Sequence, residues 1–204
     1  GLSNLTKIPV KVPHWIRGRE AAELLSPLPR PLHMLGLGMS VGTPAEGISA
    51  DAVVVSSFNE LEQLGRQGIE GKIVVFNVPF ESYGRAVVYR MEGPSRAGTL
   101  GAVAVLVRSV TPLAMQQPHT GTLRYKEDMP KIPAAAITIE DTLLLQRIQD
   151  SGETPRVHLF MQAHLEPDAD SADVVGEIPG SVSPEEVVVL AVTWIPGMSA
   201  KALR

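Results

Sequence analysis

Ala102-Val103-Ala104-Val105-Leu106-Val107 is a continuous apolar run that lies between Gly101 and Arg108. A short valine-rich run of this kind, bounded by turn and polar residues, is typical of a strand that is covered on both faces of a sheet. Similar short strands are predicted elsewhere along the chain, at Ala52–Val55, Lys72–Phe76, Ile132–Thr138 and Val157–Leu165. Near the start, Ile8, Val10 and Val12 alternate with other residues, which predicts a half-buried strand.

Helical patterns separate these strands. Ser57 is placed to cap a helix with Glu60 in the capping-box position, and Gly68 and Gly71 would end it. Further helices are predicted over Tyr83–Leu100, with a break at Gly93-Pro94, and over Ile139–Ser151. Alternating strands and short helices predict an α/β (α+β-like) sandwich of a mixed sheet, flanked by proline-rich edge segments.

Composition excludes several classes of protein. The 204 residues carry a net charge of -4 and no cysteine. The charge gives no footprint for nucleic acid or a membrane surface, and the lack of cysteine excludes disulfides, iron–sulfur clusters and thiolate zinc. The apolar runs are far shorter than the roughly 20 residues of a membrane helix.

Three candidate ligand motifs fail on spacing. Gly36-Leu37-Gly38-Met39-Ser40-Val41-Gly42 matches neither glycine fingerprint of nucleotide loops and is interpreted as a turn or an irregular edge strand. The acidic segment 166–173 has alanine and aspartate where a calcium loop needs a ligand and glycine, so it is interpreted as a solvated linker. Strands are expected beyond it at Val174–Ile178 and Val187–Leu190. The histidines do not converge on one metal: His14, His33, His119, His158 and His164.

The longest predicted loop, Ser109–Lys131, contains Pro118-His119-Thr120-Gly121 and, shortly after, Tyr125. Long loops inside compact domains are often functional. His119, Thr120, Gly121 and Tyr125 are therefore the candidate residues for a substrate-access or interdomain contact. The alternative, a plain surface loop, stays open.

Several stretches, in this order, resemble the protease-associated (PA) domain of the carboxypeptidase Q-like zinc metallopeptidase family. They are Val12-Pro13-His14-Trp15-Ile16-Arg17-Gly18-Arg19-Glu20, Leu35-Gly36-Leu37-Gly38 through Gly42-Thr43-Pro44, Gly71-Lys72-Ile73-Val74-Val75, Pro118-His119-Thr120-Gly121, Lys131-Ile132-Pro133-Ala134-Ala135 and Val174-Val175-Gly176-Glu177-Ile178-Pro179-Gly180-Ser181. The resemblance implies an upstream peptidase-domain segment at 1–12, a PA domain at 13–166 and the first strands of a truncated peptidase domain at 167–190.

The resemblance also implies a function for the full-length enzyme. Such an enzyme is a two-zinc exopeptidase that hydrolyses peptides or dipeptides with metal-activated water, and the PA domain acts as a lid. The implied partners are the missing peptidase domain, a peptide substrate and, as an open alternative, a second copy in a homodimer. A secreted or periplasmic location follows from the family alone. No catalytic or metal-binding residue is assigned in this chain, and no cofactor is expected in it.

The tail departs from the family, which continues with Gly-Gly-His-x-Asp-Ser-Trp-Asp-Val-Gly-Gln-Gly-Ala after the strand at Val187–Leu190. Codons permitted for Leu190–Arg204 spell Gly-Gly-His-Leu-Asp-Ser-Trp-Asp-Val-Gly-Gln-Gly-Ala when read two bases later. We therefore expect residues 191–204 to be an out-of-frame product, which the coding DNA decides. The chain is predicted to be an inactive lid fragment; the alternative is a free-standing PA-type peptide- or protein-binding module.

Overall fold

The computed structural model describes residues 2–183 and 186–190 of the chain. It forms two compact units. The larger unit is Pro13–Asp168, and the smaller unit consists of the described parts of Gly1–Val12 and Ala169–Arg204. Within the described residues, no helix combines the length and the apolar character that crossing a membrane requires.

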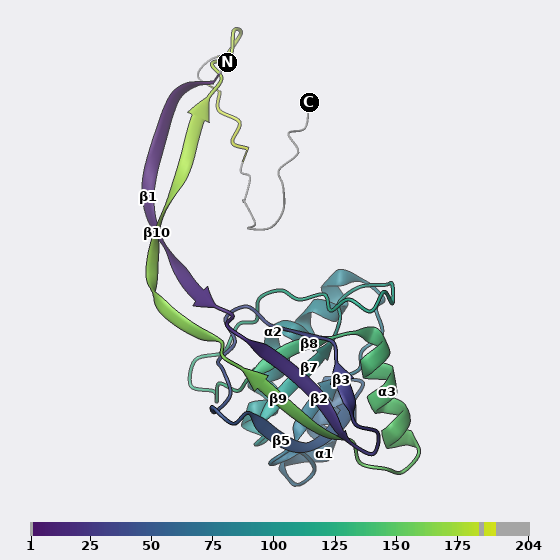
Figure 1. Cartoon of the computed structure of the whole chain (residues 1–204). Helices are drawn as coiled ribbons and strands as arrows, with labels where there is room; N and C mark the ends of the chain where they lie inside the picture. Colours follow the sequence, from purple (N-terminus) through teal and green to yellow (C-terminus); the bar gives the residue numbers. More distant parts are fainter. Residues whose placement is uncertain (1, 184–185, 191–204) are drawn as a thin grey trace. The chain divides into compact units, whose positions relative to one another are not determined.

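The larger unit is built on an eight-stranded mixed sheet (Figure 1). Its strands, in the order in which they lie side by side, are β3 (Arg30–Leu32), β2 (Glu20–Ser26), β9 (Arg156–Met161), β5 (Ile48–Val55), β6 (Ile73–Phe76), β7 (Ala104–Arg108), β8 (Ala134–Ile137) and β4 (Met34–Gly36). The four central strands β5 to β8 are parallel to one another, and all other pairings are antiparallel. The prediction of a mixed α/β fold is confirmed.

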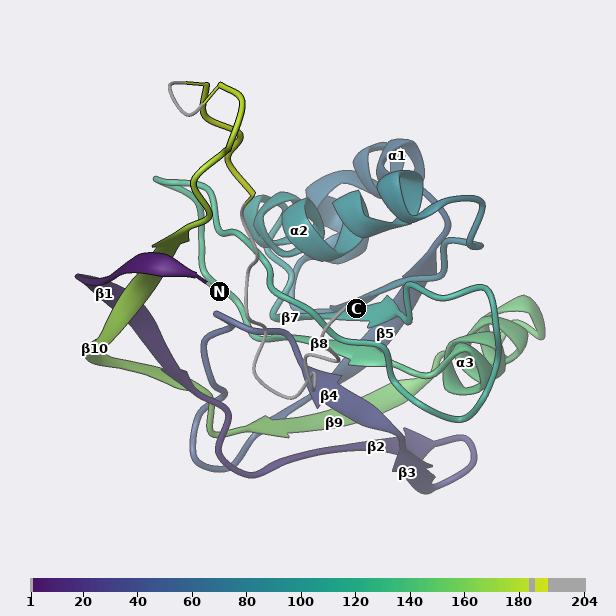
Figure 2. The same cartoon turned by 90° about the horizontal axis from the view of Figure 1, so that it is seen from above.

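The central strands are buried on both faces, as their apolar runs predict. Alternate residues point to opposite sides of a strand, so Val105 and Val107 join one apolar cluster while Ala104 and Leu106 join another. Helices α1 (Phe58–Ile69) and α2 (Tyr83–Thr99) cover the first face of the central strands (Figure 2). Helix α3 (Ile139–Asp150) packs on the opposite face, in the apolar cluster that also contains residues of β2 and β9.

The start of α1 follows its capping signal. The Ser57 side chain accepts a hydrogen bond from the backbone N–H of Glu60, so the predicted N-cap is confirmed. The Glu60 carboxylate reaches back one residue further than the usual capping box and accepts from the N–H of Ser56 at 2.6 Å. One of the orphan donors of the first helical turn, the Glu60 N–H, is thereby satisfied, and so is the N–H of the residue before the N-cap.

The predicted break at Gly93-Pro94 is wrong, because α2 runs through both residues. A proline inside a helix removes one hydrogen bond and costs about 3 kcal/mol. The face of α2 that carries Gly93, Pro94 and Ala97 is buried, and Gly93 lies close to the Phe76 ring. Tertiary packing therefore outweighs the local cost of the proline.

The predicted linker at 166–173 is also wrong: these residues lie within the long strand β10 (His164–Glu177), which pairs with β1 (Ser3–Ile16) in a two-stranded sheet (Figure 1). The strand predicted over Val157–Leu165 accordingly divides into β9 and the start of β10. Backbone pairing does not need apolar side chains, so an acidic segment can form this strand; Lys11 and Asp170 form a 2.7 Å ion pair along it. The strand expected at Ile8–Val12 is confirmed as part of β1, but most β1 side chains are exposed, so the expectation that it is half-buried is wrong.

The strand expected at Val187–Leu190 is not formed. All four side chains are exposed, and the part of the chain that the structure describes offers them no neighbouring strand. The expectation of an out-of-frame tail at 191–204 lies outside the described residues and stays a prediction.

Candidate functional site

The loop between β7 and β8 contains the predicted contact residues, and its middle is held to the edge of the sheet by the backbone. Gly38 donates its N–H to the Gly121 carbonyl at 2.9 Å, and Leu123 donates to the Gly38 carbonyl at 3.0 Å. These two bonds pin a loop without regular structure onto the residues that follow strand β4. We call Pro118–Gly121 the loop tip.

Side-chain hydrogen bonds fix the backbone of the tip from two further directions. The Ser109 hydroxyl donates to the Ile137 carbonyl and accepts from the His119 N–H, both at 2.8 Å. The Thr120 hydroxyl donates to the Gly36 carbonyl at 2.9 Å. The imidazole of His119 is exposed, and it makes no hydrogen bond to any residue that the structure describes. The tip thus presents a free imidazole on a fixed backbone.

The glycines of Gly36-Leu37-Gly38 serve close packing. A Cβ at Gly36 would lie 2.6 Å from Glu20 Oε2 and 2.8 Å from Met161 Cε, and one at Gly38 would lie 3.1 Å from Thr122 Cγ2. The interpretation of 36–42 as a turn or an irregular edge strand is confirmed: Gly36 ends β4 at the edge of the sheet, Gly38 forms an isolated bridge with Thr122, and Met39 lies in a turn. Small residues at this edge let the loop settle directly on the strand.

An ion pair between Arg17 and Glu20 holds the backbone of Gly36 on both its N–H and its carbonyl. The sequence predicted no role for this ion pair. Arg17 Nη1 lies 3.2 Å from Glu20 Oε1 and donates to the Gly36 carbonyl at 2.7 Å, while Glu20 Oε2 accepts from the Gly36 N–H at 3.0 Å. The Gly36 carbonyl therefore accepts from both Arg17 and Thr120. The i, i+3 spacing of Arg17 and Glu20 was the one available signal, and it does not specify this partner.

Tyr125 has a structural role that differs from that of the loop tip. Its hydroxyl donates to the Ile132 carbonyl at 2.6 Å and accepts from the Val41 N–H at 3.2 Å. Burial raises the pKa of the Tyr125 phenol, and hydrogen bonds from the Val41 N–H and the Ser40 hydroxyl oppose that rise. With both roles of its hydroxyl in use, Tyr125 braces the base of the loop.

A pocket of about 520 Å³ opens beside Tyr125. Its lining is apolar at Met39, Val41, Leu123, Met129 and Leu165, and it carries charges of both signs at Arg124, Lys126, Lys131, Glu127 and Asp128. Pockets of this size accommodate small ligands or single side chains of a peptide. The four predicted contact residues thus divide into three in the loop tip, of which His119 is exposed, and a tyrosine that lines a pocket.

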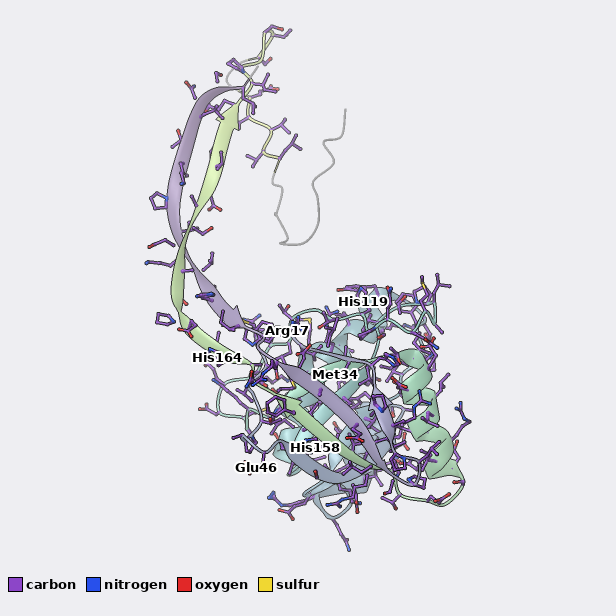
Figure 3. The ribbon with its side chains drawn as sticks, viewed as in Figure 1. Arg17, Met34, Glu46, His119, His158 and His164 are labelled. Atoms are coloured by element: carbon purple, nitrogen blue, oxygen red, sulfur yellow. The ribbon has the colours of Figure 1, made fainter. Side chains whose placement is uncertain are left out.

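The histidines lie apart from one another, and most of them form hydrogen bonds. Figure 3 shows His119, His158 and His164 well apart. His158 bonds the Ser49 hydroxyl at 2.8 Å, and His164 bonds the Gln162 carbonyl and the Glu166 carboxylate, which together raise the pKa of His164. Across 2–183 and 186–190, no three histidine or carboxylate side chains are placed to hold a metal ion. The two zinc ions that the family resemblance implies therefore find no ligand set among these residues.

Comparison with known proteins confirms the family resemblance. Curated carboxypeptidase Q sequences are 43–52% identical to this chain over 90–94% of its length. That of Xenopus laevis is 52% identical over 183 residues, which are 90% of this chain and 39% of that protein. The chain thus spans about two fifths of the length of these relatives. No family model matches the chain.

Solved structures agree. The peptidase M28 precursor from Shewanella amazonensis SB2B superposes with a TM-score of 0.85 at 32% identity, over 90% of this chain and 43% of that one. A zinc aminopeptidase from Bacillus subtilis shares the fold, with a TM-score of 0.57 at 16% identity over 88% of this chain and 38% of its own. This chain is therefore a segment homologous to peptidases.

Proposed function

We propose that this chain, a homologue of carboxypeptidase Q over nine tenths of its length, supplies the substrate-access part of a two-zinc exopeptidase. In this proposal residues 13–166 are the PA domain, and 1–12 and 167–190 flank it as segments of the peptidase domain. The zinc ligands and the hydrolytic water belong to other parts of the full-length enzyme. A secreted or periplasmic location is part of the same proposal.

The observation that carries the proposal is the loop tip, where a fixed backbone presents a free imidazole. Three hydrogen bonds, from the His119 N–H, from the Thr120 hydroxyl and to the Gly121 carbonyl, hold the tip to the sheet edge. A group ordered before binding loses little entropy when a substrate arrives. Imidazole can donate to a peptide carbonyl or carboxylate, or accept from a peptide N–H. The tip is thus suited to orient a peptide rather than to cleave it.

Kinetics of the full-length enzyme test this role. His119→Ala removes the imidazole and leaves the hydrogen bonds of the tip backbone, so KM should rise about fivefold, the worth of one hydrogen bond, with kcat nearly unchanged. His158→Ala is the matched control, since its ring bonds Ser49 on the far side of the sheet. Equal KM values for the His119 variant and the parent enzyme would remove the tip from substrate binding.

The chain by itself should not hydrolyse peptides. The described residues place no metal-binding group, and none of them is assigned a catalytic role. Incubation of the purified 204-residue chain with dipeptides and zinc should release no amino acids. Hydrolysis that a chelator abolishes would contradict this expectation.

A free-standing peptide-binding module is the second candidate, and the pocket beside Tyr125 favours it. Its apolar lining suits an apolar side chain, and its three cations, Arg124, Lys126 and Lys131, outnumber its two acids, Glu127 and Asp128, by one. Calorimetric titration of the isolated chain with short peptides distinguishes the two: saturable binding without the peptidase domain supports the module.

A further inference from the structure

Arg90 on helix α2 is a buried cation whose charge no acid balances among the residues that the structure describes. It is 6% exposed. Its Nη2 donates to the Tyr83 hydroxyl at 3.0 Å, but its Nε and Nη1 are buried and have no hydrogen-bond partner in the described part of the chain. A buried polar group left without a partner costs about 1–3 kcal/mol, and more when it is charged. Such a residue calls for a physical explanation.

The guanidinium lies flat against the loop tip. A Cβ added at Gly121 would fall 2.4 Å from Arg90 Cζ, 2.5 Å from Nη1 and 2.8 Å from Nη2. Because the central carbon is the nearest of the three atoms, Gly121 faces the plane of the guanidinium and not its edge. The Tyr83 ring lies near the same group, with its centroid 5.8 Å from Cζ. Arg90 is thereby in contact with both Tyr83 and the backbone of the tip.

Gly121 is required by space and not by backbone conformation, since its φ does not lie in the left-handed region. Any larger residue would push the guanidinium or the tip away. The contact between Arg90 and Gly121 therefore sets how closely the tip approaches helix α2. A hydrophobic side chain could fill the same volume, but it could not bond Tyr83.

We propose that Arg90 is a positioning residue, whose guanidinium, hydrogen-bonded to Tyr83 and packed flat against Gly121, sets the position of the His119 tip. This inference rests on the proposed function only for its effect on substrate. Its structural part, that Arg90 orders residues 117–122, stands on the contacts alone and is tested separately.

Amide hydrogen exchange of the full 204-residue chain tests the structural part. Arg90→Gln and Arg90→Lys each lose the guanidinium plane, the second while keeping the charge, so exchange at 117–122, where the His119 N–H is hydrogen-bonded to Ser109, should quicken about tenfold while strands β6 and β7 stay protected. Arg85→Gln is the control, because Arg85 is an exposed residue of the same helix that pairs with Glu81. Unchanged exchange at 117–122 in the Lys variant overturns the proposal, as does equal quickening throughout the chain.

A double-mutant cycle adds a readout that a general loss of stability would not produce. Gly121→Ala should quicken exchange at the tip, and Arg90→Ala should relieve that effect by making room, so the two changes should be strongly non-additive. Additive effects overturn the proposal.

Kinetics of the full-length enzyme separate this proposal from the proposed function. Arg90→Lys should raise KM about fivefold, as His119→Ala does. A raised KM for the His119 variant alone overturns the positioning role and leaves the proposed function in place. A loosened tip with KM unchanged in both variants overturns the proposed function and the effect of Arg90 on substrate, while its ordering of the tip stands.

Discussion

Replacing Tyr125 with phenylalanine removes one hydroxyl that serves two backbone groups. The Ile132 carbonyl, in a buried residue, loses a 2.6 Å hydrogen bond, and the Val41 N–H loses its acceptor at 3.2 Å. Leaving a buried group unpaired costs about 1–3 kcal/mol, so Tyr125→Phe should lower the free energy of unfolding by about 2 kcal/mol. For a chain of this size that corresponds to a fall in Tm of about 4–8 °C.

Thermal and urea unfolding followed by circular dichroism measure the effect. Tyr89→Phe is the matched control, because it makes the same chemical change in a ring that stacks on Phe58 with centroids 4.3 Å apart. The Tyr89 hydroxyl has no hydrogen bond within the described residues, so this variant should stay within about 0.5 kcal/mol of the parent. Equal losses for the two variants would refute the brace assigned to Tyr125.

The stability difference between the parent chain and Tyr125→Phe should also depend on pH. Burial raises the pKa of Tyr125 above its usual value of about 10, so the unfolded chain releases this proton first. The contribution of Tyr125 to stability is complete below about pH 10 and is lost as the pH rises through the folded-state pKa. The difference in unfolding free energy between the parent and Tyr125→Phe should therefore shrink above pH 10. A constant difference across that range contradicts the expected shift.

Two further substitutions test the packing and capping of the helices. Gly93→Ala would place a Cβ 2.6 Å from Phe76 Cε2 and should cost about 1–3 kcal/mol, whereas Gly84→Ala on the same helix meets nothing within 4 Å and should not destabilise the chain in urea unfolding. Ser57→Ala removes the acceptor of the Glu60 N–H and should cost about 1 kcal/mol, with faster amide exchange at the start of α1; unchanged exchange there would argue against the cap.

The central strands and helices could be predicted from the sequence because local signals and tertiary burial agree there. The apolar run at 102–107 includes all of β7 except Arg108, and Ser57 caps the helix that it was expected to cap. At Gly93-Pro94 local propensity and tertiary packing disagree. Local propensity predicts a break, whereas packing against Phe76 keeps the helix continuous. Sequence patterns do not include the energy of such a contact.

The acidic strand β10 could not be predicted from the sequence. Composition predicted a solvated linker at 166–173, because the segment lacks residues that could form a core. Its hydrogen bonds run to β1, more than 150 residues earlier in the chain. A strand that is stabilised by pairing with a distant segment carries little signal in its own side chains.

The sequence by itself determined the α/β class, the family resemblance and the candidate contact loop at 109–131, because these depend on local patterns and on the order of motifs. Only the tertiary structure separated His119 from Tyr125 in role and brought Arg17, Gly36 and Arg90 to the loop. Those residues come from three distant segments, and the charge and hydrogen bonds that connect them exist only after the sheet edge, helix α2 and the loop have packed together.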